Sequence, residues 1–84
     1  MHYVYILCSS NDNTQTYIGC TKDLKARLYV HNSGGSKHTS KYRPWVIAWY
    51  CAFRTMEDAR SFEKYLKSGS GKAFTRRHLG VKGE

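Results

Sequence analysis

The sequence of 84 residues lacks the features that define exported or membrane-bound proteins. Its three cysteines, Cys8, Cys20 and Cys51, are odd in number and have no C-x-x-C spacing, which indicates neither a disulfide framework nor a cysteine zinc site. The apolar run "YVYILC" has no basic segment before it and falls short of the roughly 18 residues of a membrane span. We therefore expect a reducing, cytoplasmic location and no membrane association.

Acidic residues are also scarce, and long aliphatic runs are missing. Six Asp and Glu stand against 14 Lys and Arg, which gives a formal net charge of +8. Seven Tyr and 2 Trp supply buriable area with polar tips, so a folded core is expected despite the low aliphatic content. The charge excess favours a polyanionic partner, nucleic acid first of all, although surplus lysines that only keep a small protein soluble are the alternative.

The order of hydrophobic patterns predicts a small α+β domain. We expect a three-stranded antiparallel sheet flanked by helices, in the order β-β-α-β-α with a short helical turn at the C-terminus. One domain is expected over residues 1–84, with a core of about 2–74 and a basic tail over 75–84. The strands are expected at 2–8, 16–20 and 45–53, the helices at 23–31, 55–67 and 72–79, and an exposed, mobile loop at 32–44.

One of these segments has a composition that suggests its place in the sheet. Residues 45–53, "WVIAWYCAF", are rich in β-branched and aromatic residues. A run of this kind is typical of a central strand buried on both faces, and we expect this strand to lie at the centre of the sheet.

Polar side chains stand on the apolar face of the first helix. At about 100° per residue, Arg27 and His31 fall within about 60° of Leu24, which together with Leu28 marks that face. An unpaired buried charge costs several kcal/mol, so each polar group needs a partner, a cleft edge or a ligand.

The second helix repeats this pattern. Glu63 lies about 40° from Ala59, inside the apolar arc of that helix. Three interpretations stay open: a buried Arg27–Glu63 ion pair, displaced helix boundaries that let the side chains reach solvent, or a polar site where an anion meets Arg27 and a metal meets Glu63. Tyr5 and Tyr17, on adjacent strands, either strengthen the third interpretation or simply pack against each other.

The motifs, taken together, resemble a known family. "YVYIL" is followed by "TYIGCTKDLKARLYVHN" and then by Glu63 in "ARSFEKYLKSGSG". This combination resembles the GIY-YIG nuclease domain over residues 2 to 74. It is most similar to small stand-alone bacterial members related to the N-terminal nuclease domain of the excision-repair incision subunit. The sequence departs from the family where Tyr3 replaces a glycine of the first motif, and no asparagine follows Glu63.

The resemblance implies a set of site residues. Tyr5 and Tyr17 match the motif tyrosines, Arg27 and His31 match the basic residues of the helix, and Glu63 matches the metal ligand. We expect Tyr5 as the general base, Tyr17 to position the water or phosphate, and His31 to relay a proton or orient Tyr5, and an exchange of the two tyrosine roles stays open. Arg27 is expected on the phosphoryl oxygens. A site crowded with Arg27, a metal ion and a protonated His31 is expected to lower the pKa of Tyr5.

The activity implied is metal-dependent hydrolysis of DNA. We expect an endonuclease that uses a single Mg²⁺, with Mn²⁺ as a substitute, and acts on single-stranded, branched or damaged DNA, as in DNA repair, rather than on a specific sequence. A partner protein could supply specificity, and the alternative is a non-catalytic nucleic-acid-binding module with the same fold. The expected nucleic-acid contacts are Lys22, Lys41, Tyr42, Arg43, Lys67, Lys72, Arg76 and Arg77.

Overall fold

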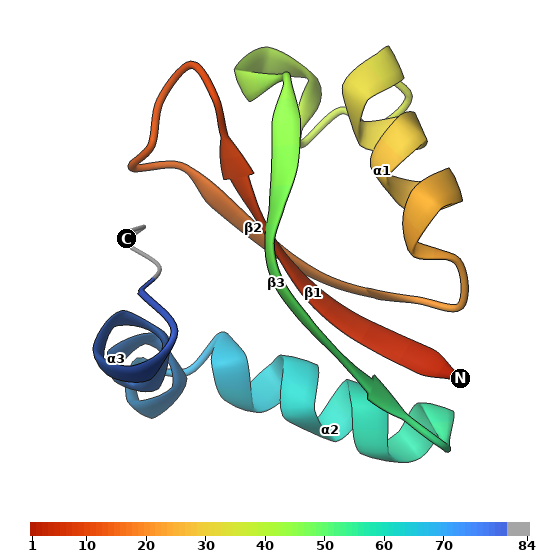
Figure 1. Cartoon of the computed structure of the whole chain (residues 1–84), viewed down its shortest axis with the longest axis vertical. Helices are drawn as coiled ribbons and strands as arrows, with labels where there is room; N and C mark the ends of the chain where they lie inside the picture. Colours follow the sequence, from red (N-terminus) through yellow and green to blue (C-terminus); the bar gives the residue numbers. More distant parts are fainter. Residues whose placement is uncertain (81–84) are drawn as a thin grey trace.

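The computed structural model describes residues 1–80, and the remainder of the expected basic tail lies outside the described part. Its elements confirm the α+β class in the order β-β-α-β-α-α, with one short 3-10 helix (η1) before the third strand (Figure 1). No helix within residues 1–80 is long and apolar enough to cross a membrane. The elements are β1 His2–Ser9, β2 Thr16–Thr21, α1 Leu24–Ser33, η1 Ser40–Tyr42, β3 Trp45–Phe53, α2 Met56–Leu66 and α3 Gly69–His78.

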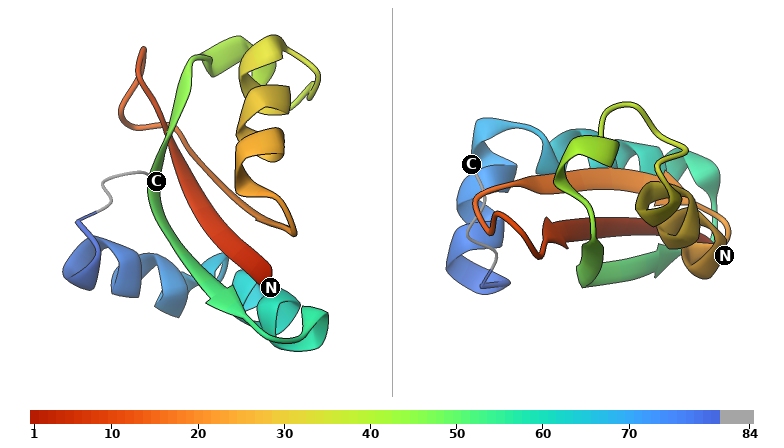
Figure 2. Two further views of the ribbon diagram at one scale, coloured as in Figure 1. Left: turned by 45° about the vertical axis from the view of Figure 1, so that its right-hand side comes forward. Right: turned by 90° about the horizontal axis from the view of Figure 1, so that it is seen from above.

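Strand β1 forms the centre of the molecule. The sheet has the order β2-β1-β3, and both neighbours run antiparallel to β1. Helix α1 lies on one side of the sheet, and α2 and α3 lie on the other (Figures 1 and 2). Because side chains alternate along a strand, Val4 and Ile6 enter the core cluster with α2, whereas Tyr5 and Leu7 enter the cluster beside α1. All four side chains are at most 2% exposed.

The prediction that residues 45–53 form the central strand is wrong. Strand β3 is an edge strand, and after the buried Trp45 its residues alternate between exposed and half-buried. Val46 and Tyr50 are about half exposed. Aromatic and β-branched residues suit any pleated, half-buried surface, so composition did not distinguish the edge from the centre. Instead, four consecutive buried residues mark the centre, and they lie in β1 at Val4–Leu7.

Helix α1 begins at Leu24, one residue after its expected start, and ends two residues later than expected. The Asp23 side chain accepts a hydrogen bond from the Ala26 N–H at 3.1 Å, and Gly34 ends the helix with a φ of 83°. The following residues contain η1, and Thr39 within them is only 1% exposed. The expectation of a wholly exposed loop over residues 32–44 is therefore wrong, because this segment packs between α1 and β3.

The C-terminal part is more regular than predicted. Thr55 caps α2, and the helical turn expected at 72–79 is a ten-residue helix, α3, that begins within the segment "SGSG" and has its first turn capped by the Ser68 side chain. The basic residues Arg76 and Arg77 lie on this helix, as the helical segment expected at 72–79 predicts. Gly71 explains why α3 can begin so soon after α2 ends. A Cβ on this residue would collide with the Tyr65 carbonyl oxygen and approach Leu66 Cα to 2.5 Å, so glycine permits close packing of α2 and α3.

Replacing Gly71 with alanine should destabilise the protein by about 1–3 kcal/mol or more, because the new methyl group meets backbone atoms that cannot move aside. Urea denaturation followed by circular dichroism measures the change. Gly69→Ala is the matched control, since a Cβ at that position has nothing within 4 Å and alanine favours the helix. Equal stabilities of the two variants would contradict this account of the helix crossing.

Candidate active site

The two motif tyrosines, Tyr5 and Tyr17, come together because the residue of β2 that faces Tyr5 is a glycine. Tyr5 on β1 is the register partner of Gly19 on β2. A Cβ at Gly19 would collide with the Tyr5 hydroxyl, and it would lie 2.6 Å from Tyr5 Cζ and 3.0 Å from Tyr17 Cε2. With glycine there, the Tyr5 side chain lies over β2, and the centroids of the two tyrosine rings are 6.3 Å apart. The glycine of the YIG motif thus makes room for the hydroxyl of the other motif.

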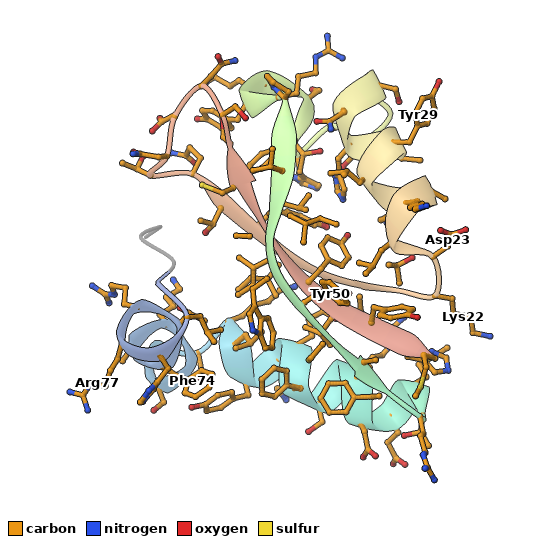
Figure 3. The ribbon with its side chains drawn as sticks, in the orientation of Figure 1. Lys22, Asp23, Tyr29, Tyr50, Phe74 and Arg77 are labelled. Atoms are coloured by element: carbon orange, nitrogen blue, oxygen red, sulfur yellow. The ribbon has the colours of Figure 1, made fainter. Side chains whose placement is uncertain are left out.

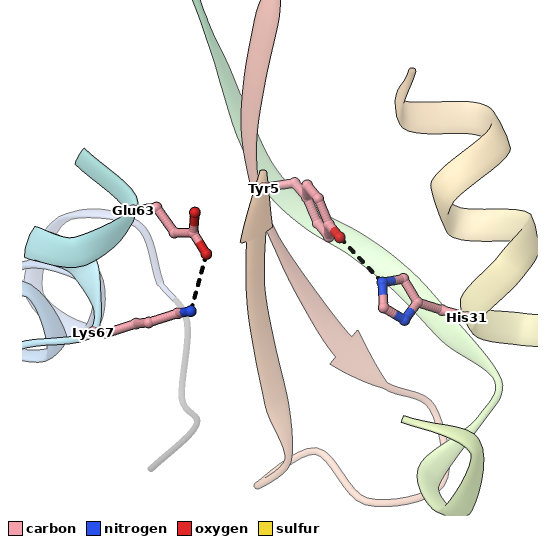
Figure 4. A network of polar contacts seen from close by, with 4 residues as sticks. All are labelled: Tyr5, His31, Glu63 and Lys67. Carbon is pink, nitrogen blue, oxygen red and sulfur yellow. Dashed lines mark hydrogen bonds and ion pairs between the residues drawn. The ribbon is translucent and has the colours of Figure 1, made fainter. Parts of the chain in front are cut away.

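His31 joins this pair from helix α1. Its Nε2 lies 3.1 Å from the Tyr5 hydroxyl oxygen (Figure 4), and its ring centroid lies 4.8 Å from that of Tyr17. The side chain is 1% exposed, which confirms the expectation that this polar residue stands on the inner face of the helix. The imidazole therefore contacts both tyrosines in an environment closed to bulk water.

Thr39 completes the hydrogen bonding of His31, a role that the sequence did not predict. Its Oγ1 lies 2.8 Å from His31 Nδ1, so each ring nitrogen has one polar partner. The Thr39 carbonyl accepts a hydrogen bond from the Trp45 indole N–H at 2.8 Å. The Asn32 amide also donates to the Trp45 carbonyl at 3.0 Å, which ties the end of α1 to β3. A threonine in a polar loop carries no sequence signal for this role, because only the packing of the loop buries it.

Burial sets the protonation of the Tyr5–His31 pair. It raises the pKa of Tyr5 to about 12, with smaller contributions in the same direction from Tyr17 and Glu63, while Arg27 acts in the opposite direction. Burial, followed by the charge of Arg27, lowers the pKa of His31 below 6.5. The expected lowering of the Tyr5 pKa included the charge of a bound metal ion and stays a prediction, whereas burial opposes the expected protonation of His31. At pH 7 the described structure holds a neutral phenol beside a neutral imidazole.

Arg27 is exposed, unlike His31, although both were placed on the inner face. Leu24 and Leu28 are only half-buried, so α1 packs against the sheet mainly through its C-terminal half, where His31 is buried. The Arg27 side chain therefore reaches solvent. Its charge nevertheless affects the pKa of both Tyr5 and His31. The guanidinium group thus stands at the border between the buried pair and the solvent.

Glu63 approaches from α2 with its side chain 18% exposed. Its carboxylate pairs with Lys67 one helical turn later, at 2.9 Å (Figure 4), and this is the only ion pair within residues 1–80. The Arg27–Glu63 pair considered from the sequence is therefore not formed. The charge of Glu63 raises the pKa of Tyr5 and also that of Cys20, which places the carboxylate near the β2 edge of the sheet.

The expected nucleic-acid contacts fall into two groups. One group flanks α1 and η1, and the other lies on α2 and α3, across the sheet, as the labelled Lys22 and Arg77 illustrate (Figure 3). Tyr42 differs from the rest because it packs, half-buried, against the core cluster beside α1. The first group is Lys22, Lys41, Tyr42 and Arg43, and the second is Lys67, Lys72, Arg76 and Arg77.

Fold and site together define a class: small α+β domains in which two tyrosines on adjacent antiparallel strands meet a histidine of the first helix, and the next helix carries a carboxylate. Residues 1–77 match the family model described as the GIY-YIG catalytic domain. The chain belongs to the GIY-YIG family, whose members are generally endonucleases.

Relatives of similar size support this assignment. The chain is 36% identical over 72 residues to a UPF0213 protein of Bacillus pumilus, covering 84% of this chain and 71% of the relative. It is 37% identical over 71 residues to a UPF0213 protein of Staphylococcus haemolyticus, covering 82% and 83%. A UPF0213 protein of Clostridium perfringens is 35% identical over 68 residues, covering 80% and 71%.

Replacing Thr39 with valine should destabilise the protein by about 1–3 kcal/mol, because the variant leaves His31 Nδ1 buried without a partner. Thr39→Ser keeps the hydroxyl and should recover most of that loss. The measurement is chemical denaturation at pH 7, with Thr75→Val as control, since the Thr75 hydroxyl bonds only to a carbonyl of its own helix. A valine variant as stable as the wild type would show that Thr39 does not hold His31.

Proposed function

We propose that this chain is a metal-dependent endonuclease that hydrolyses phosphodiester bonds in DNA, selecting its substrate by structure or single-strandedness rather than by sequence. The observation that carries the proposal is the setting of the Tyr5 hydroxyl. It lies 3.1 Å from an imidazole that is neutral at pH 7, while the Arg27 cation and the Glu63 carboxylate both act on its pKa. An imidazole on the hydroxyl, with a cation and a carboxylate whose charges reach it, forms the set of groups that phosphodiester hydrolysis uses.

Tyr5 serves as the general base with the help of His31. A phenol with a pKa of about 12 is not ionised beforehand at neutral pH. In the tautomer that carries its proton on Nδ1, His31 Nε2 accepts from the Tyr5 O–H, so the imidazole takes this proton as the phenol oxygen receives one from the attacking water. His31 then becomes an imidazolium, with its Nδ1–H donating to Thr39 Oγ1. The step moves two protons and leaves a hydroxide equivalent for attack on phosphorus.

Arg27 and Tyr17 handle the phosphate. The exposed guanidinium carries a permanent charge and a planar set of donors, which suits the phosphoryl oxygens of the transition state. Tyr17 is half-buried with its ring against His31, and its hydroxyl orients the water or the phosphate. The role of base falls to Tyr5 rather than Tyr17 because the hydrogen bond to His31 Nε2 belongs to Tyr5.

Glu63 would hold the metal ion. Residues 1–80 contain no cluster of three or more His, Cys, Asp or Glu side chains that could hold a metal ion, so Glu63 would bind the ion without a second or third protein ligand of such a cluster. This donor set fits Mg²⁺, and also Mn²⁺, because Mg²⁺ is commonly bound through one or two carboxylates, several waters and substrate oxygens. When bound, such an ion neutralises charge on the phosphate and its leaving oxygen. Lys67 is 55% exposed and can leave the carboxylate for a substrate phosphate.

The charge distribution supports a DNA substrate without sequence readout. Exposed basic side chains lie on both sides of the sheet, and contacts of this kind to phosphates give salt-dependent affinity for any sequence. A partner protein that supplies specificity would fit this arrangement. A non-catalytic binding module is the alternative, but it has no use for a carboxylate that is only 18% exposed, as Glu63 is.

The intact protein should cleave single-stranded, duplex or branched DNA in the presence of Mg²⁺ or Mn²⁺ and not in EDTA. Glu63→Gln should reduce the cleavage rate by at least about 100-fold, because the neutral amide is a poor ligand for the ion. Glu57→Gln is the matched control, since Glu57 is an exposed residue in the first turn of the same helix. Labelled substrates resolved on a gel give the rates. DNA that is bound but never cut would replace the nuclease proposal with the binding module.

Cleavage should depend on the neutral form of His31. The groups that face its ring are Tyr5, Tyr17 and Thr39, together with Arg27 on the same helix. The pKa of His31 lies below 6.5, so single-turnover rates should hold from pH 7.5 to about pH 6.5 and fall as the pH drops further. In His31→Gln the acid limb should disappear while the rate falls by about 100-fold or more. If the rate of His31→Gln still falls at low pH, the fall is due to the protonation of another group.

A further inference from the structure

Tyr50 is the most exposed aromatic side chain of the sheet, at 54%. It is the register partner of Tyr5, so the two side chains leave the same face of the sheet from neighbouring strands about 5 Å apart. Figure 3 places Tyr50 near the middle of β3. A large aromatic group is thus exposed to solvent directly beside the candidate active site, where it adds little to the core.

The surroundings of Tyr50 hold its ring in place and leave space next to it. Tyr3, which stands where the GIY-YIG motif has a glycine, packs against it with the ring centroids 6.1 Å apart and the planes at 62°. Ala48 and Ala52, the residues two positions away on β3, are small and exposed. The ring is therefore held in place by one neighbour, while no bulky side chain on its own strand covers the adjoining surface.

The charges around this surface suit a nucleic acid strand. None of the three strands contains Asp or Glu. The exposed Lys22 follows Thr21, the register partner of Tyr3, and the exposed Arg54 follows directly after β3. Two cations thus stand at the end of the sheet where Tyr3 lies, and Arg27 stands at the active site. Phosphates of one strand can follow these cations, while the neutral surface between them is left for a base.

We infer that Tyr50, supported by Tyr3, is a stacking site for an unpaired nucleobase of the DNA strand bound at the active site. Bases of an intact duplex are stacked on one another, so such a site selects single-stranded or locally unpaired DNA. The inference rests on the proposed nuclease function in one respect: that function places the bound DNA strand across Tyr5 and Arg27. The stacking itself is a property of binding and does not require cleavage.

The test measures binding in EDTA, where cleavage does not occur, with single-stranded and duplex oligonucleotides that carry 2-aminopurine at successive positions. Tyr50→Leu should weaken single-strand binding by roughly 5- to 100-fold and abolish quenching of 2-aminopurine at one position. Tyr50→Phe keeps the ring and should restore both, whereas duplex binding should not change. Tyr29→Leu is the matched control, because Tyr29 is 73% exposed on α1. Thermal melts of all variants verify the fold.

Two results would overturn the stacking site: single-strand affinity that does not change in Tyr50→Leu, or a loss that is equal for single-stranded and duplex DNA. The second result would indicate a general electrostatic or structural effect. Cleavage by the intact protein in Mg²⁺ is measured separately. If stacking depends on the Tyr50 ring but the protein never cleaves DNA, the nuclease proposal is refuted and the stacking site is retained. If the protein cleaves DNA but binding does not depend on the Tyr50 ring, only the stacking site is refuted.

Discussion

The hydrogen bond between the Tyr5 hydroxyl and His31 Nε2 is the contact on which this face of the molecule depends. It joins the central strand to α1 across a region that neither residue exposes to solvent. It forms only because Gly19 leaves space for the phenol and Thr39 satisfies the other imidazole nitrogen. Trp45 then fixes Thr39 through its indole N–H. Four elements are thereby tied to one pair of polar side chains, and a buried polar pair of this kind is costly unless every member has a partner.

The central strand β1 contributes to two different clusters because its side chains alternate between the two faces of the sheet. Val4 and Ile6 face α2 and form an apolar core with Ala59 and Leu66, whereas the opposite side carries the polar cluster around Tyr5. Helix α2 contributes to both: Ala59 and Leu66 pack in the apolar core, and the charge of Glu63 on the same helix affects the pKa of Tyr5 and Cys20. The polar cluster can hold groups with shifted pKa values since the apolar layer behind it supplies much of the stabilising burial.

Much of the fold was accessible from the sequence, and the errors share one cause. The α+β class, the Asp23 and Thr55 caps and the buried position of His31 follow from patterns that extend over a few residues. The position of β3 in the sheet and the start of the C-terminal helix at Gly69 rather than Lys72 depend on which segment packs beside which. A glycine such as Gly71 looks the same in a sequence whether it breaks a helix or lets two helices touch.

The sequence by itself determined which residue types stand at the candidate site, because motif spacing and helical periodicity bring Tyr5, Tyr17, His31 and Glu63 to predictable faces. Only the tertiary structure decided their electrostatic state. Burial raises the pKa of Tyr5 despite the nearby Arg27 cation, and it lowers that of His31. Desolvation depends on every atom packed around a group, including those from distant segments, so no local pattern contains it.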